Sequence, residues 1–175
     1  LVKYNSSGTK QWTKQIGTSS DDLSHRIAID SNGNIYVTGY TYGGLDGNTN
    51  LGSYDVILLK YNSSGTKQWT QQLGTTSGES GSGVAVDSNG NVYVAGSTLG
   101  GLDGNVNTGL GDIFLVKYNA SGTKQWTKQL GTSATEEVTG ASVDSGGNVY
   151  ITGYTRGGLD GNTSAGNKDI FLLKY

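Results

Sequence analysis

The sequence predicts an all-β repeat protein in which each repeat forms a sheet of four antiparallel strands. Three observations lead to this fold class. One unit returns every 57 residues, as Trp12, Trp69 and Trp126 show, without an insertion or a deletion. Within each unit, short apolar runs are separated by Asn-Gly and Ser-Gly turns, a pattern typical of β-hairpins. A single sheet of this size cannot cover both of its faces, so neighbouring repeats must stack on one another.

The composition agrees with many short strands joined by tight turns. The chain of 175 residues has 30 glycines and no proline, cysteine or methionine, with 33% hydrophobic and 15% charged residues. A net charge of -2, with lysines spread at fixed places in the repeat, argues against a nucleic-acid partner. No run approaches the roughly 20 apolar residues that a membrane span needs. Without cysteine, neither disulfides nor thiolate metal sites can form.

The repeat frame divides the chain into three copies and a remainder. Residues 1–57, 58–114 and 115–171 form the three repeats, and residues 172–175 begin a fourth. Both ends of the sequence fall inside the same Lys-Tyr strand motif, which indicates a window from a longer array. Three sheets are too few for a closed ring, so we expect further repeats from the rest of the polypeptide or from other copies of the chain.

Each repeat begins with the end of one strand and a hairpin to the next. Leu1–Tyr4 is the end of a strand, Asn5–Gly8 is a turn, and Lys10–Ile16 is an outer strand whose lysine keeps the sheet edge soluble. Trp12 and every second residue of that strand share one face, and we expect each tryptophan to pack against an adjacent sheet. Thr18–Arg26 differs most between copies and is predicted to be a surface loop, with 75–83 and 132–140 as its equivalents.

The second half of the repeat holds another hairpin, a long loop and a buried strand. Ile27–Asp30 is predicted as a short inner strand, and Ile35–Thr41 follows it after an Asn-Gly turn. Gly43–Asp55 is a glycine-rich loop that leads into the apolar strand Val56–Tyr61. In the next copy, Ile113–Val116 is apolar at consecutive positions, which is typical of a strand buried on both faces.

The size of the side chains indicates how the sheets are arranged. The inner strand of the second copy, 83–86, carries only small and mid-sized residues, which suits a crowded place near a central axis. Radially repeated four-stranded sheets form a β-propeller, and this is the predicted architecture. A β-solenoid is the alternative, but its rungs are usually shorter and lack alternating Asn-Gly hairpins.

The repeat resembles a known family, the bacterial β-propeller repeats called SBBP, in the segments SNGNVYVAGST (88–98), DIFLVKYN (112–119) and KQWTKQLGTS (124–133). The portion VAVDSNGNVYV is also similar to NHL repeats. The likeness covers the whole chain and includes the order of both hairpins. It implies propeller blades from a large secreted or surface protein of a bacterium, without a defined activity. The family's acidic pair after the outer strand is present as Asp21-Asp22 and Glu136-Glu137, whereas the second copy has Gly78-Glu79.

The glycine-rich loop is the best candidate for chemistry, because side chains with oxygen atoms alternate along it. Hard oxygen ligands at positions one, three and five resemble the start of a calcium loop, since alternate side chains of a curled backbone can converge on one ion. An EF-hand differs by its glycine at position six and its glutamate at position twelve. The alternative is that these side chains bond turn amides. The candidate Ca²⁺ ligands are Asp46, Asn48, Asn50, Asp55, Asp103, Asn105, Asn107, Asp112, Asp160, Asn162, Ser164 and Asp169.

Other polar and aromatic residues are predicted to be structural. Asp30 and its equivalents, Asp87 and Asp144, open tight turns, where their carboxylates accept hydrogen bonds from backbone N–H groups. His25 is the single histidine and is predicted to be solvated, so one chain cannot build a His-dependent triad or a histidine-rich metal site. The strand tyrosines either pack inside the sheets or form a sugar-stacking surface; they are Tyr36, Tyr40, Tyr93, Tyr150 and Tyr154.

These observations favour a protein without catalytic activity. Near-identical copies are typical of arrays of equivalent contacts, whereas an enzyme normally breaks symmetry at one site. The leading hypothesis is a noncatalytic extracellular or cell-surface scaffold for adhesion, interaction or assembly. One alternative is a calcium-dependent module that binds carbohydrate or protein through its loops. The other is a filament that self-assembles by exchange of the duplicated Lys-Tyr strand.

Overall fold

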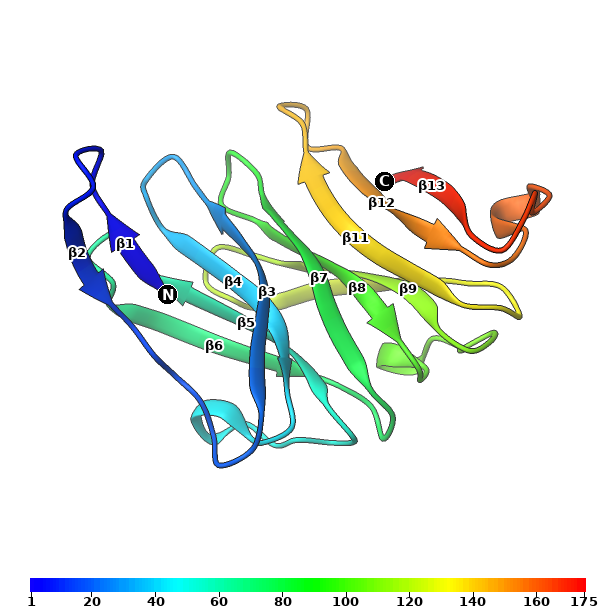
Figure 1. Ribbon diagram of the computed structural model, residues 1–175, viewed down its shortest axis with the longest axis horizontal. Coiled ribbons are helices and arrows are strands. Elements are labelled where there is room, and N and C mark those ends of the chain that lie inside the picture. Colours follow the sequence, from blue (N-terminus) through cyan, green and yellow to red (C-terminus); the bar gives the residue numbers. More distant parts are fainter.

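The computed structural model describes residues 1–175, which form an all-β protein of sheets standing in a row (Figure 1). The strand orders in the four sheets are β1-β2, β3-β4-β5-β6, β7-β8-β9-β10 and β11-β12-β13. All named strand pairs are antiparallel, as predicted. The strands are β1 (Val2–Tyr4), β2 (Lys10–Thr13), β3 (Asp22–Ile29), β4 (Ile35–Thr41), β5 (Asp55–Tyr61), β6 (Lys67–Leu73), β7 (Glu79–Val86), β8 (Val92–Thr98), β9 (Asp112–Tyr118), β10 (Lys124–Leu130), β11 (Glu136–Val143), β12 (Val149–Thr155) and β13 (Asp169–Lys174).

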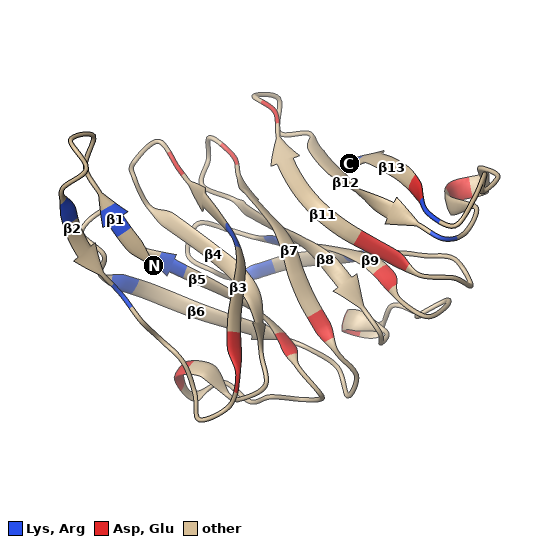
Figure 2. Ribbon diagram, in the orientation of Figure 1, with Lys and Arg blue, Asp and Glu red and all other residues tan.

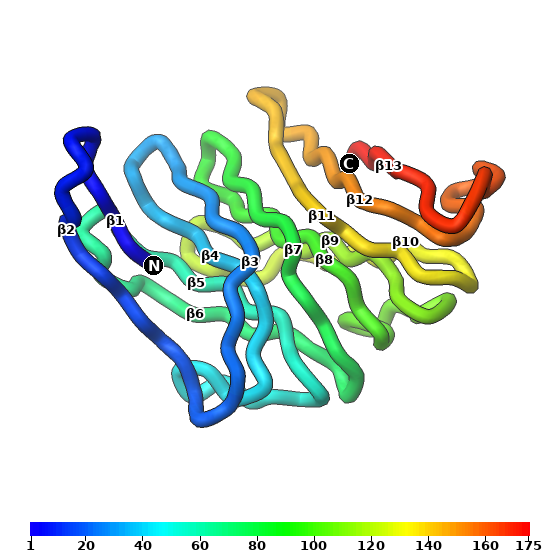
Figure 3. The backbone as a smooth tube through the Cα atoms, in the orientation of Figure 1, coloured from blue at the N-terminus to red at the C-terminus, as the bar shows by residue number.

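The sheets are offset from the repeat frame of the sequence. Strands β3 to β6 form the first blade, β7 to β10 the second, and β11 to β13 a third blade of three strands. The β1-β2 hairpin corresponds to the third and fourth strands of a blade. Figure 3 shows the backbone passing from one sheet to the next along the row, with the two chain ends apart. Four-stranded antiparallel blades at a 57-residue period are thus confirmed for the first and second blades.

One predicted loop is wrong, because Thr18–Arg26 is not a loop throughout. Strand β3 already begins at Asp22, and β7 and β11 begin at the equivalent glutamates. The inner strand of each blade is therefore eight residues long. A register shift interrupts each of these strands, between residues 24 and 26 in β3. This bulge breaks the alternation of side chains. The sequence pattern therefore did not indicate a strand in its first half.

The second strand of each blade carries a glycine opposite this bulge. A Cβ atom on Gly39 would lie 1.9 Å from the carbonyl oxygen of Leu23, and the equivalents Gly96 and Gly153 meet the same obstacle. Only glycine allows the two backbones to approach this closely. The bulge and the glycine opposite it therefore occur together in every blade.

The hydrophobic core consists of layers between neighbouring sheets. One cluster joins Tyr36, Val56 and Leu58 of the first blade to Val94, Phe114 and other residues of the second. A second cluster joins the second blade to the third, and a third cluster lies between the first blade and the β1-β2 hairpin. Residues 113–116 of β9 are at most 1% exposed, so this strand is buried on both faces as predicted.

The outer strands tie each blade to the next one. The ring of Trp69 packs against Gly122 of the second blade, where an added Cβ atom would lie only 2.9 Å from the ring. Lys60 donates a hydrogen bond from Nζ to the carbonyl oxygen of Ala120 at 3.0 Å, and its Nζ lies 5.8 Å from the centre of the Trp69 ring. These contacts confirm that the tryptophans pack against an adjacent sheet.

The Asn-Gly turns at one end of the blades are closed by aspartate, as predicted. Asp30 accepts hydrogen bonds from the backbone N–H groups of Asn32 and Asn34, each at 2.9 Å, and from the hydroxyl of Tyr36 at 3.1 Å. Asp87 and Asp144 make the same contacts. We call this end of the blades the turn end, and the opposite end the loop end.

Candidate functional site

The loop end is where the three blades differ from one another. It is formed by the glycine-rich loops 43–55, 100–112 and 157–169, together with the links that lead into the next blade, 74–78 and 131–135. The first two loops pair with the links that follow them: in the first, Ser53 donates its N–H to the carbonyl oxygen of Ser77 at 2.8 Å, and Tyr54 forms a parallel bridge with Gly78. The turn end, by contrast, is almost identical in every copy.

The glycine-rich loop is anchored by a buried leucine and by a glutamine from the fourth strand. Leu45 is buried, and its N–H donates to Oε1 of Gln72 at 3.0 Å. The amide nitrogen of Gln72 donates in turn to the carbonyl oxygen of Gly43 and to Asp55 Oδ2. Leu102 and Gln129 repeat this arrangement in the second blade. The glutamine is present at the same place in each repeat, and this was the sequence signal for its role.

The first candidate calcium ligand of the first and second loops pairs with the fourth strand of its own blade. Asp46 has a left-handed backbone with φ of 53° and forms an ion pair with Lys67 and a hydrogen bond with Thr70. Burial would raise the pKa of Asp46, but the hydrogen bonds from Lys67 and Thr70 outweigh it and lower the pKa below its usual value. Asp103 makes the same contacts with Lys124 and Thr127. The edge lysines, predicted only to keep the sheet soluble, therefore also hold these loops.

The last two candidate ligands of each loop form a second group. Asp55 is fully buried, and its Oδ2 accepts hydrogen bonds from the N–H of Leu51 and from Gln72, both at 3.0 Å. The amide nitrogen of Asn50 donates to the carbonyl oxygens of Tyr42 and Gly52. Asn107 and Asp112 repeat this group in the second loop, and in the third Ser164 donates to Asp169 at 2.9 Å.

The geometry therefore separates the predicted calcium ligands of a loop into two networks and a middle residue that belongs to neither. The middle residues, Asn48, Asn105 and Asn162, donate their amide nitrogens to the carbonyl oxygen of the preceding leucine. No group of three or more acidic or histidine side chains is placed to hold a metal ion. Three buried oxygens of the second network nevertheless have no hydrogen-bond donor: Oδ1 of Asn50, Oδ1 of Asp55 and Oδ1 of Asn107. Calcium binding remains a prediction.

The acid at the start of each inner strand was noted from the sequence as part of the family's acidic pair, but its contacts were not predicted. Glu79 is fully buried and accepts hydrogen bonds from the N–H and hydroxyl of Thr75, both at 2.7 Å, and from the hydroxyl of Thr98 at 3.0 Å. Glu136 makes the equivalent contacts, and Asp22 occupies this place in the first blade. Figure 2 shows these acidic segments at the beginnings of β3, β7 and β11. This acid is present in every copy, and it fixes the link between blades by accepting hydrogen bonds from uncharged threonine groups.

An aromatic cluster is present at the loop end of the first blade alone. Ring centroids of Tyr40, Tyr42 and Tyr54 lie 5.1 to 5.8 Å apart, and the ring of His25 lies 5.3 Å from Tyr40. His25 is exposed, as predicted, but its Nδ1 is also 3.2 Å from the carbonyl oxygen of Gly81 in the second blade. We name these four residues the tyrosine cluster. Tyr42 and Tyr54 lie in loops, so the alternating pattern of the strands could not predict that these two residues lie close to Tyr40.

The other strand tyrosines have structural roles. Tyr36 and Tyr93 are buried, and their hydroxyls donate to the turn aspartates Asp30 and Asp87. Burial raises the pKa of Tyr36, and the charge of the nearby Asp30 raises it further. Only Tyr40 among the predicted sugar-stacking residues belongs to the tyrosine cluster.

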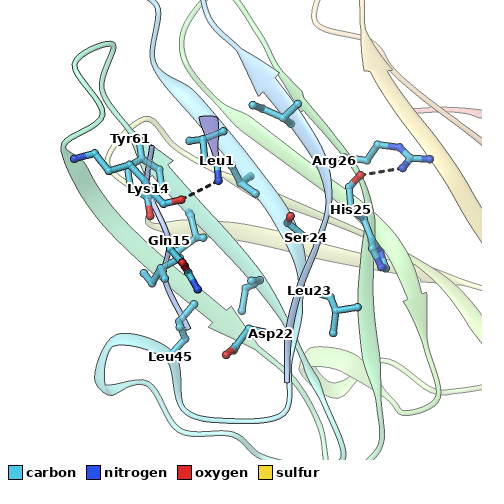
Figure 4. A pocket seen from close by; sticks show the side chains of 15 residues that line it. Leu1, Lys14, Gln15, Asp22, Leu23, Ser24, His25, Arg26, Leu45 and Tyr61 are labelled. Atoms are coloured by element: carbon cyan, nitrogen blue, oxygen red, sulfur yellow. Dashed lines mark hydrogen bonds between the residues drawn. The ribbon is translucent and has the colours of Figure 1, made fainter. Parts of the chain in front are cut away.

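A cavity of about 330 Å³ lies between the β1-β2 hairpin and the first blade (Figure 4). Its floor is apolar and includes Val37, Ile57 and Leu59, and its walls include Leu1 on one side and Leu23 on the other. The equivalent space between the first and second blades is filled by β3 and β4, the inner two strands of the first blade. We call this space the hairpin cleft.

Comparison with known proteins agrees with the repeat structure. The sequence profile of a family described as "Beta-propeller repeat", SBBP, matches residues 11–46, 68–103 and 125–160. The chain is 33% identical over 162 residues to the regulatory protein FlaEY of Caulobacter vibrioides, and 26% identical over 188 residues to an uncharacterized WD repeat-containing protein of Acanthamoeba polyphaga mimivirus. Each match covers 83% of this chain but only 17% and 13% of the respective relative. No helix has the length and apolar character needed to cross a membrane.

Proposed function

We infer that this chain, which belongs to the SBBP family of β-propeller repeats, is a noncatalytic scaffold whose two end faces bind further blades of the same kind. The observation that carries this proposal is a difference in exposure between equivalent residues. Apolar side chains that are buried between blades in the middle of the row are exposed at both of its ends. Such faces are the surfaces through which repeat arrays add neighbours.

The C-terminal end face is the outer side of the third blade. Ile170 and Leu172 on β13 are 89% and 71% exposed, whereas the equivalent residues of β9, Ile113 and Leu115, are each 1% exposed. In β9 these positions pack against the next blade, in the cluster that contains Val138. Burying each side chain contributes about 1.5–3 kcal/mol. A further blade on β13 would therefore recover a contact that the second blade already makes.

The N-terminal end face is the inner strand of the first blade, next to the hairpin cleft. Ile27 and Ile29 on β3 are 52% and 63% exposed, whereas Val84, the equivalent of Ile27 on β7, is 7% exposed. The hairpin cleft beside them occupies the space that two inner strands fill in the next joint. Strands β11 and β12 of a second copy have the right identity to fill it, and β13, the equivalent of β1, would then take the place of β1 beside β2. The two end faces thus complement each other in a head-to-tail contact.

Sedimentation velocity over a wide range of protein concentrations tests this proposal. We expect the wild-type chain to associate with increasing concentration. A variant carrying Ile170→Glu and Leu172→Glu is expected to remain a monomer, because a buried charge without a partner opposes the contact. The matched control carries Val106→Glu and Leu110→Glu, which are 76% and 71% exposed in the second glycine-rich loop.

This control is expected to associate like the wild type, because its substitutions lie at the loop end and not on an end face. A wild-type chain that stays monomeric at every concentration contradicts binding between copies. Equal association of both double variants would contradict the assignment of the end faces.

An extracellular or cell-surface location is part of the same proposal. It is supported by the family resemblance described above, and an adhesive or assembly role follows from the repeated contacts. The near identity of the copies supports a role without catalysis. Exposure of intact cells to an external protease tests the location: a surface scaffold is cleaved while cytoplasmic markers stay intact, and protection of the protein until lysis contradicts it.

Calcium-dependent ligand binding is the second candidate function. The observation in its favour is that two buried oxygens of the first loop, Oδ1 of Asp55 and Oδ1 of Asn50, have no hydrogen-bond partner. A bound cation would stabilise the folded chain by mass action. We expect calcium to raise the melting temperature of the wild type but not of Asp55→Asn, with each protein compared in calcium and in chelator. No heat on calorimetric titration and no effect of chelator would remove this function.

A further inference from the structure

The tyrosine cluster breaks the symmetry of an otherwise regular protein. The places of His25, Tyr40, Tyr42 and Tyr54 are taken in the second blade by Ser82, Ser97, Leu99 and Gly111, and in the third by Thr139, Tyr154, Arg156 and Lys168. All three blades fold with the same strand pairing around this place. A blade therefore does not need the aromatic residues, and their presence in one blade requires another explanation.

The cluster is built into the joint between the first and second blades. A Cβ atom on Gly78 would lie 2.5 Å from Cζ of Tyr54, so the tyrosine ring occupies the space that this glycine leaves. At the next joint the sizes are reversed: in the equivalent bridge, Gly111 stands in the place of Tyr54, and the larger Thr135 stands in the place of Gly78. Large and small residues thus alternate across the joint. The fit fixes the position of the Tyr54 ring before any ligand arrives, which reduces the entropy cost of binding.

The spacing of the rings decides which kind of ligand they suit. Centroid separations of 5.1 to 5.8 Å with interplanar angles of 49° to 79° mean that the three tyrosine rings already touch one another. There is no space between them for a methylated ammonium group, so the cluster is not a cation cage. Binding must use the outward surface of the rings. Tyr42 is 41% exposed, and the other two tyrosines are half-buried.

The polar groups around the rings are neutral or already engaged. The carboxylates of Asp22 and Glu79 accept hydrogen bonds from threonines. Arg26 donates its guanidinium to the carbonyl oxygens of His25 and Thr139. The cluster hydroxyls make no side-chain hydrogen bond, whereas the equivalent Tyr154 donates its hydroxyl to Glu137. Burial raises the pKa of Tyr54, and the neighbouring groups of Tyr42, Glu79 and Tyr40 add to it, which keeps its hydroxyl protonated as a donor.

This combination matches the chemistry of a sugar. A pyranose ring has a face of C–H groups, which is attracted to the negative face of an aromatic ring, and a rim of hydroxyls, which pair with neutral donors and acceptors. An anionic ligand would need a free cation or a row of N–H groups, which the cluster lacks. We propose that the tyrosine cluster is a binding site for a neutral carbohydrate, which stacks on Tyr42 and hydrogen-bonds to the free tyrosine hydroxyls.

Affinity electrophoresis of the native chain in gels containing polysaccharide tests this site. The neutral probes are laminarin, mannan, dextran and hydroxyethyl cellulose, and alginate is the anionic comparison. We expect retardation by at least one neutral polysaccharide and none by alginate. Tyr42→Ala is expected to weaken the interaction about tenfold, whereas Tyr4→Ala, which alters an exposed tyrosine of β1 outside the cluster, should leave it unchanged.

Exchange of residues between blades separates ligand binding from folding. The variant Tyr40→Ser, Tyr42→Leu and Tyr54→Gly carries the residues of the second blade and is expected to lose retardation while it keeps its β-sheet spectrum. The reverse variant, Ser97→Tyr, Leu99→Tyr and Gly111→Tyr with Thr135→Gly, builds a second cluster. It should double the number of oligosaccharides bound per chain in calorimetry with the retained probe.

Several outcomes would overturn the proposal. These are no retardation by any neutral polysaccharide, retardation by alginate alone, or retardation that survives both Tyr42→Ala and the exchange of blade residues. A proline-rich peptide that binds the wild type, when no polysaccharide does, would assign the cluster to peptide recognition instead. The end-face proposal does not depend on these results, because the tyrosine cluster lies at the loop end.

Discussion

Replacing Leu51 with threonine supplies a hydrogen bond that the second loop has and the first lacks. In the second loop, the hydroxyl of Thr108 lies 3.2 Å from both carboxylate oxygens of the buried Asp112. In the first loop, the side chain of Leu51 has no hydrogen-bond donor, and Oδ1 of Asp55 has no partner. The backbone is already in place, because the N–H of residue 51 donates to Asp55 Oδ2 at 3.0 Å, as does its equivalent in the second loop.

The expected gain follows from the geometry of the second loop. A hydrogen bond to a charged group contributes about 1.5–3 kcal/mol. A distance of 3.2 Å is long for a hydroxyl donor, so we expect Leu51→Thr to raise the free energy of unfolding by about 1 kcal/mol. Leu51 is 57% exposed, so little apolar burial is lost. For a chain of this size, the melting temperature should rise by about 2–4 °C.

Thermal and urea unfolding in the presence of chelator measures this gain. Leu51→Val is the matched control, because valine has the shape of threonine without its hydroxyl. The reverse substitution, Thr108→Val, should destabilise the chain by a similar amount. Equal stability of the threonine and valine variants at position 51, or a Thr108→Val variant as stable as the wild type, would refute the assignment of Asp55 Oδ1 as an unsatisfied acceptor.

Two further predictions concern the joints and the turns. Gly122→Ala and Gly147→Ala both place alanine at a positive φ, but only Gly122 lies under the Trp69 ring. We expect Gly122→Ala to destabilise the chain more than Gly147→Ala and to shift tryptophan fluorescence to the red. Equal effects of the two substitutions would contradict the packing of Trp69 on Gly122. Burial would raise the pKa of Asp30, but hydrogen bonds led by that from Asn34 lower it below its usual value. The folded pKa is then below the unfolded one of about 3.9, so the turn adds stability above that pH and loses it as the pH falls through the folded pKa. Unfolding by urea at decreasing pH should therefore show a weaker loss of stability in Asp30→Asn, and an unchanged slope would contradict this account.

The sequence was informative wherever a pattern acts over short distances. The Asn-Gly turns and the alternating residues around them located Ile35–Thr41, which is the strand observed. The apolar run of β9 indicated a strand buried on both faces. Asp30 was assigned its turn role because it opens a tight turn, and its carboxylate accepts hydrogen bonds from the backbone N–H groups two and four residues ahead. Each of these inferences depends on residues that are neighbours in the chain.

Features that depend on distant residues were not accessible in this way. The bulge in β3 shifts its register, so the alternation that marks a strand is absent from residues 22–26. Spacing alone suggested that Asp46 and Asp55 converge on an ion, but it could not show that Asp46 pairs with Lys67 while Asp55 pairs with Gln72. The tyrosine cluster joins residues from β3, β4 and two loop positions, and only the packing of the blades brings them together.

The central claim, that the end faces bind further blades, is tested most directly by a tandem chain. Lys3-Tyr4 and Lys174-Tyr175 occupy the same place in the repeat, so appending residues 5–175 after Tyr175 continues the 57-residue period without interruption. The third blade then receives a fourth strand equivalent to β6. We predict slow amide exchange along β13 and a melting temperature above that of the single chain. Two halves that unfold like the single chain, with unchanged exchange in β13, would contradict the account.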